Sequence, residues 1–165
     1  MKGIFFAIAA VAAGLPGTPA QAHPTDCGAQ RPVIASLLAD YRGAIERLDA
    51  RGTERFFAAD SAIFENGGVE GNYANYLAHH LGPELGHFRS FRFTDHRLEL
   101  WCEGAVAVAT ETYNYRIERI QGDPIERRGV TTSVLRRTTA GWRIVNMHGS
   151  SRVPRPATAP QPPRN

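Results

Sequence analysis

The chain has 165 residues and a formal net charge of +3 at pH 7, a length that suits one domain with a single sizeable core. Its arginines are spread along the sequence rather than gathered in one block, which argues against nucleic-acid binding. It has no glycine-rich phosphate loop, no nucleophile elbow of the Ser-His-Asp type and no paired-cysteine zinc motif, so nothing in the sequence supports a nucleotide-binding, acyl-transfer or structural-zinc function.

The first 22 residues have the features of a secretory signal. Met1-Lys2 is a short basic start, residues 3–15 are almost wholly apolar, and Ala20-Gln21-Ala22 is a small-x-small cleavage site. The apolar run is too short to span a membrane. We therefore expect residues 1–22 to be a cleaved signal peptide, residues 23–31 to form the mature N-terminal segment, and the protein to be periplasmic or secreted without a membrane anchor.

Only two cysteines are present, Cys27 and Cys102. An oxidising compartment would allow them to pair, and the bridge would fasten the mature N-terminus to the sheet. The alternative is a buried free Cys102 with a mobile Cys27. The sequence leaves both possibilities open.

Three helices are predicted before the long strands. Residues 33–51 carry apolar side chains at the i, i+3, i+4, i+7 spacing of an amphipathic helix, and Gly52 ends it. Thr53 stands where an N-cap is wanted for a short second helix over residues 54–59. A third helix is predicted over residues 71–85, strained by Pro83. A short strand over residues 61–65 lies between the last two.

The remainder of the domain is predicted to be strands. Phe91 and Phe93 have the opposite parity to Leu98 and Leu100, which indicates a bulge or bend near Asp95-His96. Two long strands, residues 105–120 and 125–138, are joined by a turn and followed by a last strand that begins after Gly141. Residues 153–165 form a proline-rich tail that is predicted to be disordered.

The last strand carries the most informative pattern. By the two-residue period, Trp142, Ile144, Asn146 and His148 share one face. A face that begins with Trp and Ile is expected to be buried, which would place His148 at its end. The alternative for His148 is a structural role in which it satisfies a neighbouring polar group.

The order of elements, the helix over residues 71–85 and the ending Gly-Trp-Arg-Ile-Val-Asn-Met-His-Gly-Ser-Ser-Arg at residues 141–152 resemble the nuclear transport factor 2-like superfamily, within it the SnoaL-like and DUF4440-type bacterial proteins. The resemblance covers about residues 32–152. It implies an α+β, cone-shaped domain of three N-terminal helices packed on a strongly bent antiparallel sheet, and frequent homodimerisation through the outer sheet face. Many relatives have an aromatic residue where this chain has Gly149, which implies a more open pocket.

Three functions are expected from this resemblance and the residues together. In the first, the cone binds a small, partly apolar molecule, and the residues that line or flank it are Tyr73, Tyr76, His80, Trp101, Asn146 and His148. In the second, a cofactor-independent isomerase, cyclase or dehydratase uses His148 or His80 as general base. Asp60, Glu65 and Glu70 lie near turns and are interpreted as caps or surface charges.

The third expected function is metal binding. His80, Glu84 and His87 have i, i+4 and i+7 spacing, so a continuous helix would place them on one side, where they could bind copper or zinc. The alternative is that Glu84 forms an ordinary ion pair at a helix end.

Overall fold

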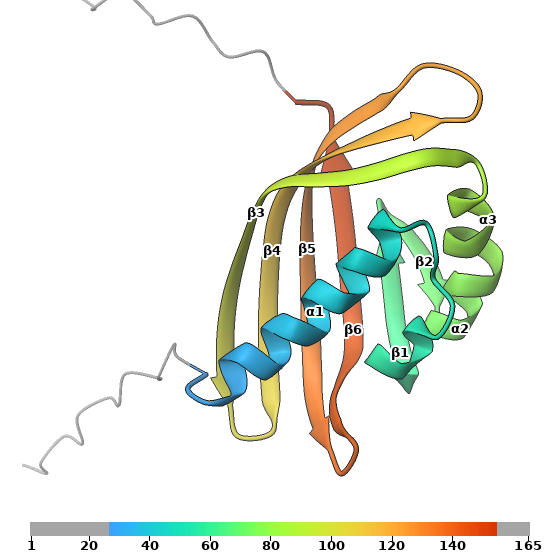
Figure 1. The fold of residues 1–165 in the computed structure, drawn as a ribbon. Helices are drawn as coiled ribbons and strands as arrows, with labels where there is room; N and C mark the ends of the chain where they lie inside the picture. Colours follow the sequence, from blue (N-terminus) through green and yellow to red (C-terminus); the bar gives the residue numbers. More distant parts are fainter. Residues whose placement is uncertain (1–26, 155–165) are drawn as a thin grey trace, which may run out of the picture.

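The computed structural model of the protein describes residues 27–154, and it consists of one long helix, one helical segment and a curved sheet (Figure 1). No helix among the described residues is long and apolar enough to cross a membrane. The predicted signal peptide lies outside the described residues, as does all of the predicted tail beyond Pro154.

The six strands form one mixed sheet in the order β2-β1-β6-β5-β4-β3. All neighbours are antiparallel except β1 and β6, which run parallel. The prediction of an antiparallel sheet is therefore wrong at this one pairing. The strand bounds are β1 Phe57–Glu65, β2 Gly68–Gly71, β3 Phe88–Glu103, β4 Val106–Arg119, β5 Ile125–Thr138 and β6 Gly141–Arg152.

Helix α1 (Gln30–Glu46) lies diagonally across the concave face of the sheet (Figure 1). It buries Ile34, Leu38 and Ile45 against a core that includes Leu135 and Ile144, both fully buried. A disulfide joins Cys27, just before α1, to Cys102 near the end of β3. Together, the core contacts and the disulfide hold α1 against the strands that form the cavity described below.

The expected three N-terminal helices are reduced to α1 and one helical segment that follows β2. The predicted second helix is only a 3-10 turn, η1 (Thr53–Phe56), and Phe57 already begins β1. Phe57 pairs with Ile144 of β6 and stacks on Tyr73 at a centroid distance of 3.6 Å. Burial of this ring in the sheet outweighs the weak helix preference of the segment.

The second helical segment is continuous through α2 (Tyr73–Tyr76), η2 (Leu77–Leu81) and α3 (Gly82–Leu85). The side chain of Asn72 caps its start by accepting a hydrogen bond from the N–H of Asn75 at 2.9 Å. Its middle turn, η2, is a π-helix. Pro83 lacks the N–H of a regular helix and would crowd the carbonyl four residues earlier, and the wider turn directly before α3 relieves that conflict.

Two bulges determine which side chains face the cavity. In β3 the register shifts between Thr94 and Arg97, and Asp95 has a φ of 53°, which confirms the predicted irregularity near Asp95-His96. Figure 1 shows β3 leaving α3 across the top of the molecule before it turns down alongside β4. The first part of β3 thereby brings Phe88, Phe91 and Phe93 to the cavity described below.

The second bulge lies in β6 and was not predicted. Leu135 pairs with Ile144 and Val134 pairs with Asn146, so Val145 is the extra residue. Trp142, Ile144 and then Met147 are buried, whereas His148 is exposed. The predicted shared face of Trp142, Ile144, Asn146 and His148 is therefore wrong beyond Ile144, because one inserted residue moves every later side chain to the other face.

Candidate functional site: an aromatic cavity with an acidic rim

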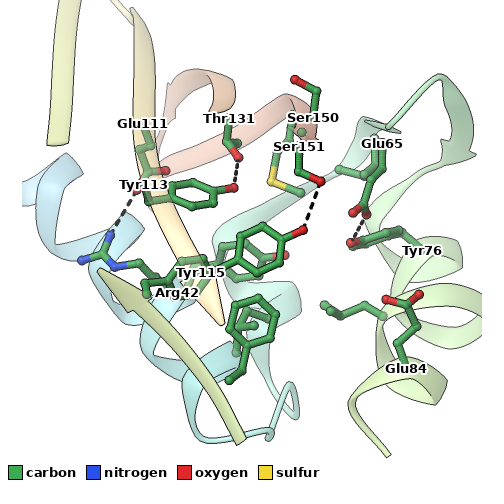
Figure 2. A pocket seen from close by; sticks show the side chains of 18 of the residues that line it. Arg42, Glu65, Tyr76, Glu84, Glu111, Tyr113, Tyr115, Thr131, Ser150 and Ser151 are labelled. Atoms are coloured by element: carbon green, nitrogen blue, oxygen red, sulfur yellow. Dashed lines mark hydrogen bonds and ion pairs between the residues drawn. The ribbon is translucent and has the colours of Figure 1, made fainter. Parts of the chain in front are cut away.

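A cavity of about 170 Å³ lies between α1, the concave face of the sheet and the second helical segment (Figure 2). Its charged lining residues are Arg42, Glu65, Glu84 and Glu111. The other lining residues are mostly apolar or aromatic, and they include Tyr41, Leu81, Leu85, Phe88, Phe91, Phe93, Tyr113, Tyr115, Ile117 and Met147, with Thr131, Ser133, Gly149 and Ser151 adding small or polar surface.

Stacked aromatic rings from β3 and β4 form one wall of the cavity. Phe91 stacks on Tyr115 at a centroid distance of 5.3 Å, and Phe93 meets Tyr113 edge to face at 5.0 Å. A Cβ atom on Gly129 would lie 2.3 Å from the ring of Tyr113. Glycine at this position of β5 therefore allows the Tyr113 ring to lie flat against the sheet.

The same side of the cavity holds a group of charges that we call the paired wall, formed by Arg42, His96 and Glu111. Arg42 Nη1 donates to Glu111 Oε1 at 3.1 Å, and His96 Nε2 lies 2.8 Å from the same oxygen. The residue Glu111 is 8% exposed. Because a buried carboxylate is costly without partners, Arg42 and His96 account for its presence there.

The hydroxyl groups near this wall are also bonded within the protein. The hydroxyls of Tyr113 and Thr131 share a hydrogen bond of 2.7 Å, and Tyr115 donates to Ser151 Oγ at 3.0 Å. Among the residues that the structure describes, no buried side-chain nitrogen or oxygen lacks a hydrogen-bond partner. The polar groups on this side of the cavity therefore already have hydrogen-bond partners within the protein.

The opposite side carries a different cluster, which we call the acidic rim: Glu65, Glu70, His80 and Glu84 (Figure 2 shows Glu65 and Glu84 with Tyr76). His80 Nδ1 lies 3.0 Å from Glu70, and His80 Nε2 lies 3.5 Å from Glu84 and 4.0 Å from Glu65. The hydroxyl of Tyr76 donates to Glu65 Oε2 at 2.6 Å. One imidazole is therefore shared by three carboxylates from β1, β2 and α3.

The surroundings of the acidic rim shift its ionisation. The hydrogen bond to Glu70 raises the pKa of His80, which favours its charged form. Burial raises the pKa of Glu84, even though the nearby His80 opposes that shift. Burial and the charge of Glu65 raise the pKa of Tyr76 well above its ordinary value, so its hydroxyl stays protonated and acts as a hydrogen-bond donor.

The structure places the predicted ligand-binding residues in several different locations. Tyr76 lines the cavity, and His80 lies beside it in the acidic rim. Tyr73 lies in the core beneath, where its hydroxyl is 2.7 Å from that of Thr53. Trp101 borders a separate hollow together with Arg31 and Val108.

The two residues taken from the last strand do not line the cavity. Asn146 and His148 follow the bulge at Val145, and their neighbours Met147 and Gly149 line the cavity in their place. The ring of His148 packs edge to face against Phe64 at 6.3 Å. The prediction that His148 and His80 face one cavity is therefore wrong, which removes His148 as a partner of His80 in acid–base chemistry.

The predicted metal ligands are not brought together as a set. Within residues 27–154, no group of three or more histidine, cysteine, aspartate or glutamate side chains has an arrangement that could hold a metal ion. Helix α3 ends at Leu85, and His87 follows in an exposed turn. The i, i+4, i+7 spacing places His80, Glu84 and His87 on one side only if a single helix continues through all three positions, and this helix ends before His87.

Several cavity residues were missed by sequence reasoning although a signal for them was available. Glu111, Tyr113, Tyr115 and Ile117 alternate along β4 and all line the cavity, a period-two pattern visible in the sequence. Glu65 was interpreted as a cap or surface charge because it precedes a turn. Nothing local to its own strand marks it, since its partners come from other elements.

An α+β domain with a bent sheet, a helix across the concave face and a cavity between them is a fold that hosts many different functions. Residues 34–156 match the SnoaL-like domain. The chain therefore belongs to the SnoaL-like family. A search of curated proteins found no match.

Solved structures with the same fold come from the wider superfamily. A nuclear transport factor 2-like superfamily protein from Salmonella enterica serovar Typhimurium is 19% identical with a TM-score of 0.68, and the match covers 79% of this chain and 96% of that one. A putative dehydratase from Streptomyces avermitilis is 19% identical with a TM-score of 0.62, covering 76% and 98%. A putative ketosteroid isomerase from Shewanella frigidimarina is 20% identical with a TM-score of 0.60, covering 70% and 92%. At these identities the likeness concerns the fold.

Proposed function

We propose that the cavity binds a small, partly apolar molecule. The observation that carries this proposal is a cavity of about 170 Å³ lined by aromatic and aliphatic side chains, with a few charged groups at two separate places. This composition is typical of small-molecule sites, in which apolar surface supplies affinity and few polar groups set orientation. Gly149 lies on the cavity wall and leaves space there that a larger side chain would occupy.

Filling that space tests the proposal. The neutral fluorescent probe N-phenyl-1-naphthylamine should bind the wild type, and Gly149→Leu should weaken its binding by roughly tenfold or more because the new side chain occupies the cavity. His148→Leu is the matched control, since it adds the same side chain one residue away on the exposed side of β6. A wild type that does not bind the probe, or equal binding by both variants, would reject the proposal.

We propose proton-transfer catalysis as the second candidate, in a cofactor-independent isomerase, cyclase or dehydratase. The specific observation is that Glu65 lines the cavity, accepts a hydrogen bond from Tyr76 and lies near His80. Such a carboxylate could accept a proton from a bound substrate, and once Glu65 is protonated the Tyr76 hydroxyl is released from it and could donate to a developing oxyanion. Two of the structural neighbours are described as a putative dehydratase and a putative ketosteroid isomerase.

This second candidate predicts measurable isomerisation of a small β,γ-unsaturated cyclic ketone, followed by the ultraviolet absorption of the conjugated product. Glu65→Gln should lower the rate by about 100-fold or more, because it removes the proton acceptor and keeps the shape. Glu99→Gln, the same change at an exposed position of β3, should leave the rate unchanged. Equal rates for wild type and Glu65→Gln would exclude Glu65 as the base.

We propose that the protein is exported and that mature protein begins at His23. The support is the basic start, apolar run and small-x-small site within residues 1–22. N-terminal sequencing of protein from the periplasmic or culture fraction should read His-Pro-Thr. An uncleaved chain recovered from the cytoplasm would reject export.

We propose a homodimer formed through the outward face of the sheet. The long strands β4 and β5 present half-exposed apolar and threonine side chains there, among them Val108, Thr110 and Thr132. Sedimentation at tens of micromolar should give a dimer, and Thr132→Arg should dissociate it by placing a charge in the interface. A monomeric wild type would reject the proposal.

A further inference from the structure

The charges that line the cavity are unevenly distributed. One of the four charged lining residues is a cation, Arg42, and it is bonded to Glu111 in the paired wall. The other two carboxylates, Glu65 and Glu84, lie together on the opposite side. Among the described residues that line the cavity, no cationic side chain is paired with Glu65 or Glu84.

His80 lies behind these two carboxylates and does not balance them. It is shared with Glu70, which it approaches most closely. Even with the imidazole fully protonated, one positive charge faces the three carboxylates of Glu65, Glu70 and Glu84. The side chains of Glu65 and Glu84 are 31% and 54% exposed, so water solvates this excess of negative charge in part, and the excess attracts a cation and repels an anion.

The surroundings of the two carboxylates suit an organic cation. Glu65 and Glu84 can each accept hydrogen bonds, and an ammonium group offers three donors. The ring of Tyr76 lies beside Glu65, and the ring of Tyr115 faces the cavity from the aromatic wall opposite (Figure 2). Ring faces attract cations by about 0.5–2 kcal/mol. Leu81, Leu85 and Phe88 supply apolar surface for the remainder of the molecule.

We infer that the ligand of this cavity is an amine: a protonated ammonium group held by Glu65 and Glu84, on a compact apolar or aromatic body that contacts the rings of β3 and β4. This inference rests on the proposed binding function and names its ligand class. A carboxylate ligand would meet the same two glutamates with repulsion, and a neutral ligand would leave their charge uncompensated.

Matched pairs of amine and alcohol test this choice by isothermal titration calorimetry at pH 7 and low salt. The probes are benzylamine with benzyl alcohol, phenethylamine with phenethyl alcohol, and tryptamine with tryptophol, each pair sharing one body. The amine of each pair should bind roughly tenfold more tightly than its alcohol, as expected when a hydrogen bond to a charged group is added.

Substitutions in the acidic rim show whether Glu65 and Glu84 cause the preference for amines over alcohols. Glu84→Gln and Glu65→Gln should each reduce amine affinity by about three- to tenfold and leave alcohol affinity within about twofold. Glu99→Gln makes the same change at an exposed position of β3 and should alter neither affinity. Circular dichroism of each variant checks that it is folded, and two independent rim variants guard against a local structural effect at either one.

The outcomes separate the two proposals. If the alcohols bind but the amines bind no more tightly, or if the preference survives in both rim variants, the cavity is a binding site and the amine inference is wrong. If no probe of either kind binds, the binding function fails and the inference fails with it. A tenfold preference lost in the rim variants and kept in Glu99→Gln supports both.

Discussion

The two charged regions of the cavity use the same residue types in opposite ways. In the paired wall, one carboxylate of low exposure, Glu111, has two basic partners, Arg42 and His96. In the acidic rim, one basic residue, His80, has three carboxylate partners. The charges of the paired wall are therefore balanced without a ligand, whereas the acidic rim carries an excess of negative charge that a bound cation would balance.

The elements that carry the two regions also differ, because those of the paired wall are longer than those of the acidic rim. The paired wall is carried by α1, β3 and β4, which are the long elements of the fold, and the disulfide ties the start of α1 to β3. The acidic rim is carried by the end of β1, by the four-residue β2 and by the helical segment with its π-helical turn. Ligand sites are commonly built on short elements and loops that a larger scaffold positions.

The largest expected effect comes from removing the disulfide. Replacing Cys27 and Cys102 by serine opens a loop with a sequence separation of 75, and loop entropy predicts a loss of about 4 kcal/mol in the free energy of unfolding. Hydrogen exchange should also show an added loss of protection at the start of α1, which the bridge fastens to β3. A loss below about 1 kcal/mol in the free energy of unfolding would contradict this prediction.

The next prediction compares the stability of the two regions by making the same substitution, glutamate to glutamine, in each. Glu111→Gln leaves Arg42 without its carboxylate in a partly buried site and should lower the free energy of unfolding by about 2–3 kcal/mol. Glu84→Gln, the same change in the acidic rim, should cost less than about 0.5 kcal/mol because Glu84 is half exposed and lies near other carboxylates. Urea denaturation measures both, and similar losses would remove the distinction.

A smaller effect concerns the aromatic wall beside Arg42. Gly129→Ala forces a Cβ atom to 2.3 Å from the ring of Tyr113 and should destabilise the fold by about 1–3 kcal/mol through displacement of that ring. The control is Gly149→Ala in β6, where the nearest atom is Thr131 Oγ1 at 3.9 Å. That substitution should be neutral or slightly stabilising. Thermal unfolding of both variants tests the pair.

Much of the sheet could be predicted because its signals are local. The strand Ile125–Thr138 has the predicted bounds, since period-two alternation runs along it and the turn at Gly122-Asp123-Pro124 directly precedes it. The irregularity near Asp95-His96 was visible as a change of parity. The bulge at Val145 gave no such signal, because the alternation of Trp142 and Ile144 continues smoothly into Asn146 and His148.

The candidate site was predicted less well, for a related reason. His80 and Tyr76 were identified from their own helix, but their partner Glu65 comes from β1 and its role depends on how β1 lies against the helical segment. Arg42 and Glu111 are separated by 69 residues. Pairings of this kind are set by tertiary packing, which no local pattern encodes.

The smallest predicted effect is a pH dependence of stability in the acidic rim. His80 faces Glu65, Glu70, Glu84 and the ring of Tyr76, and its folded-state pKa is raised above 6.5. Its contribution to stability is therefore fully present below about pH 6.5 and is lost as pH rises through the folded value. The raised pKa of Glu84 acts in the same direction from about pH 4.5 upward, because its charged form is disfavoured in the fold.

Solvent screening limits this dependence to below about 1 kcal/mol, so it is measured as the slope of urea-derived stability between pH 6 and 8 in low salt. His80→Asn should flatten that slope, because it removes the titrating group among the three carboxylates. His79→Asn, at the exposed neighbouring position, should leave the slope unchanged. A slope that persists in His80→Asn would assign the pH dependence to other groups, and the charge balance of the rim would then have to be determined by direct NMR titration of His80.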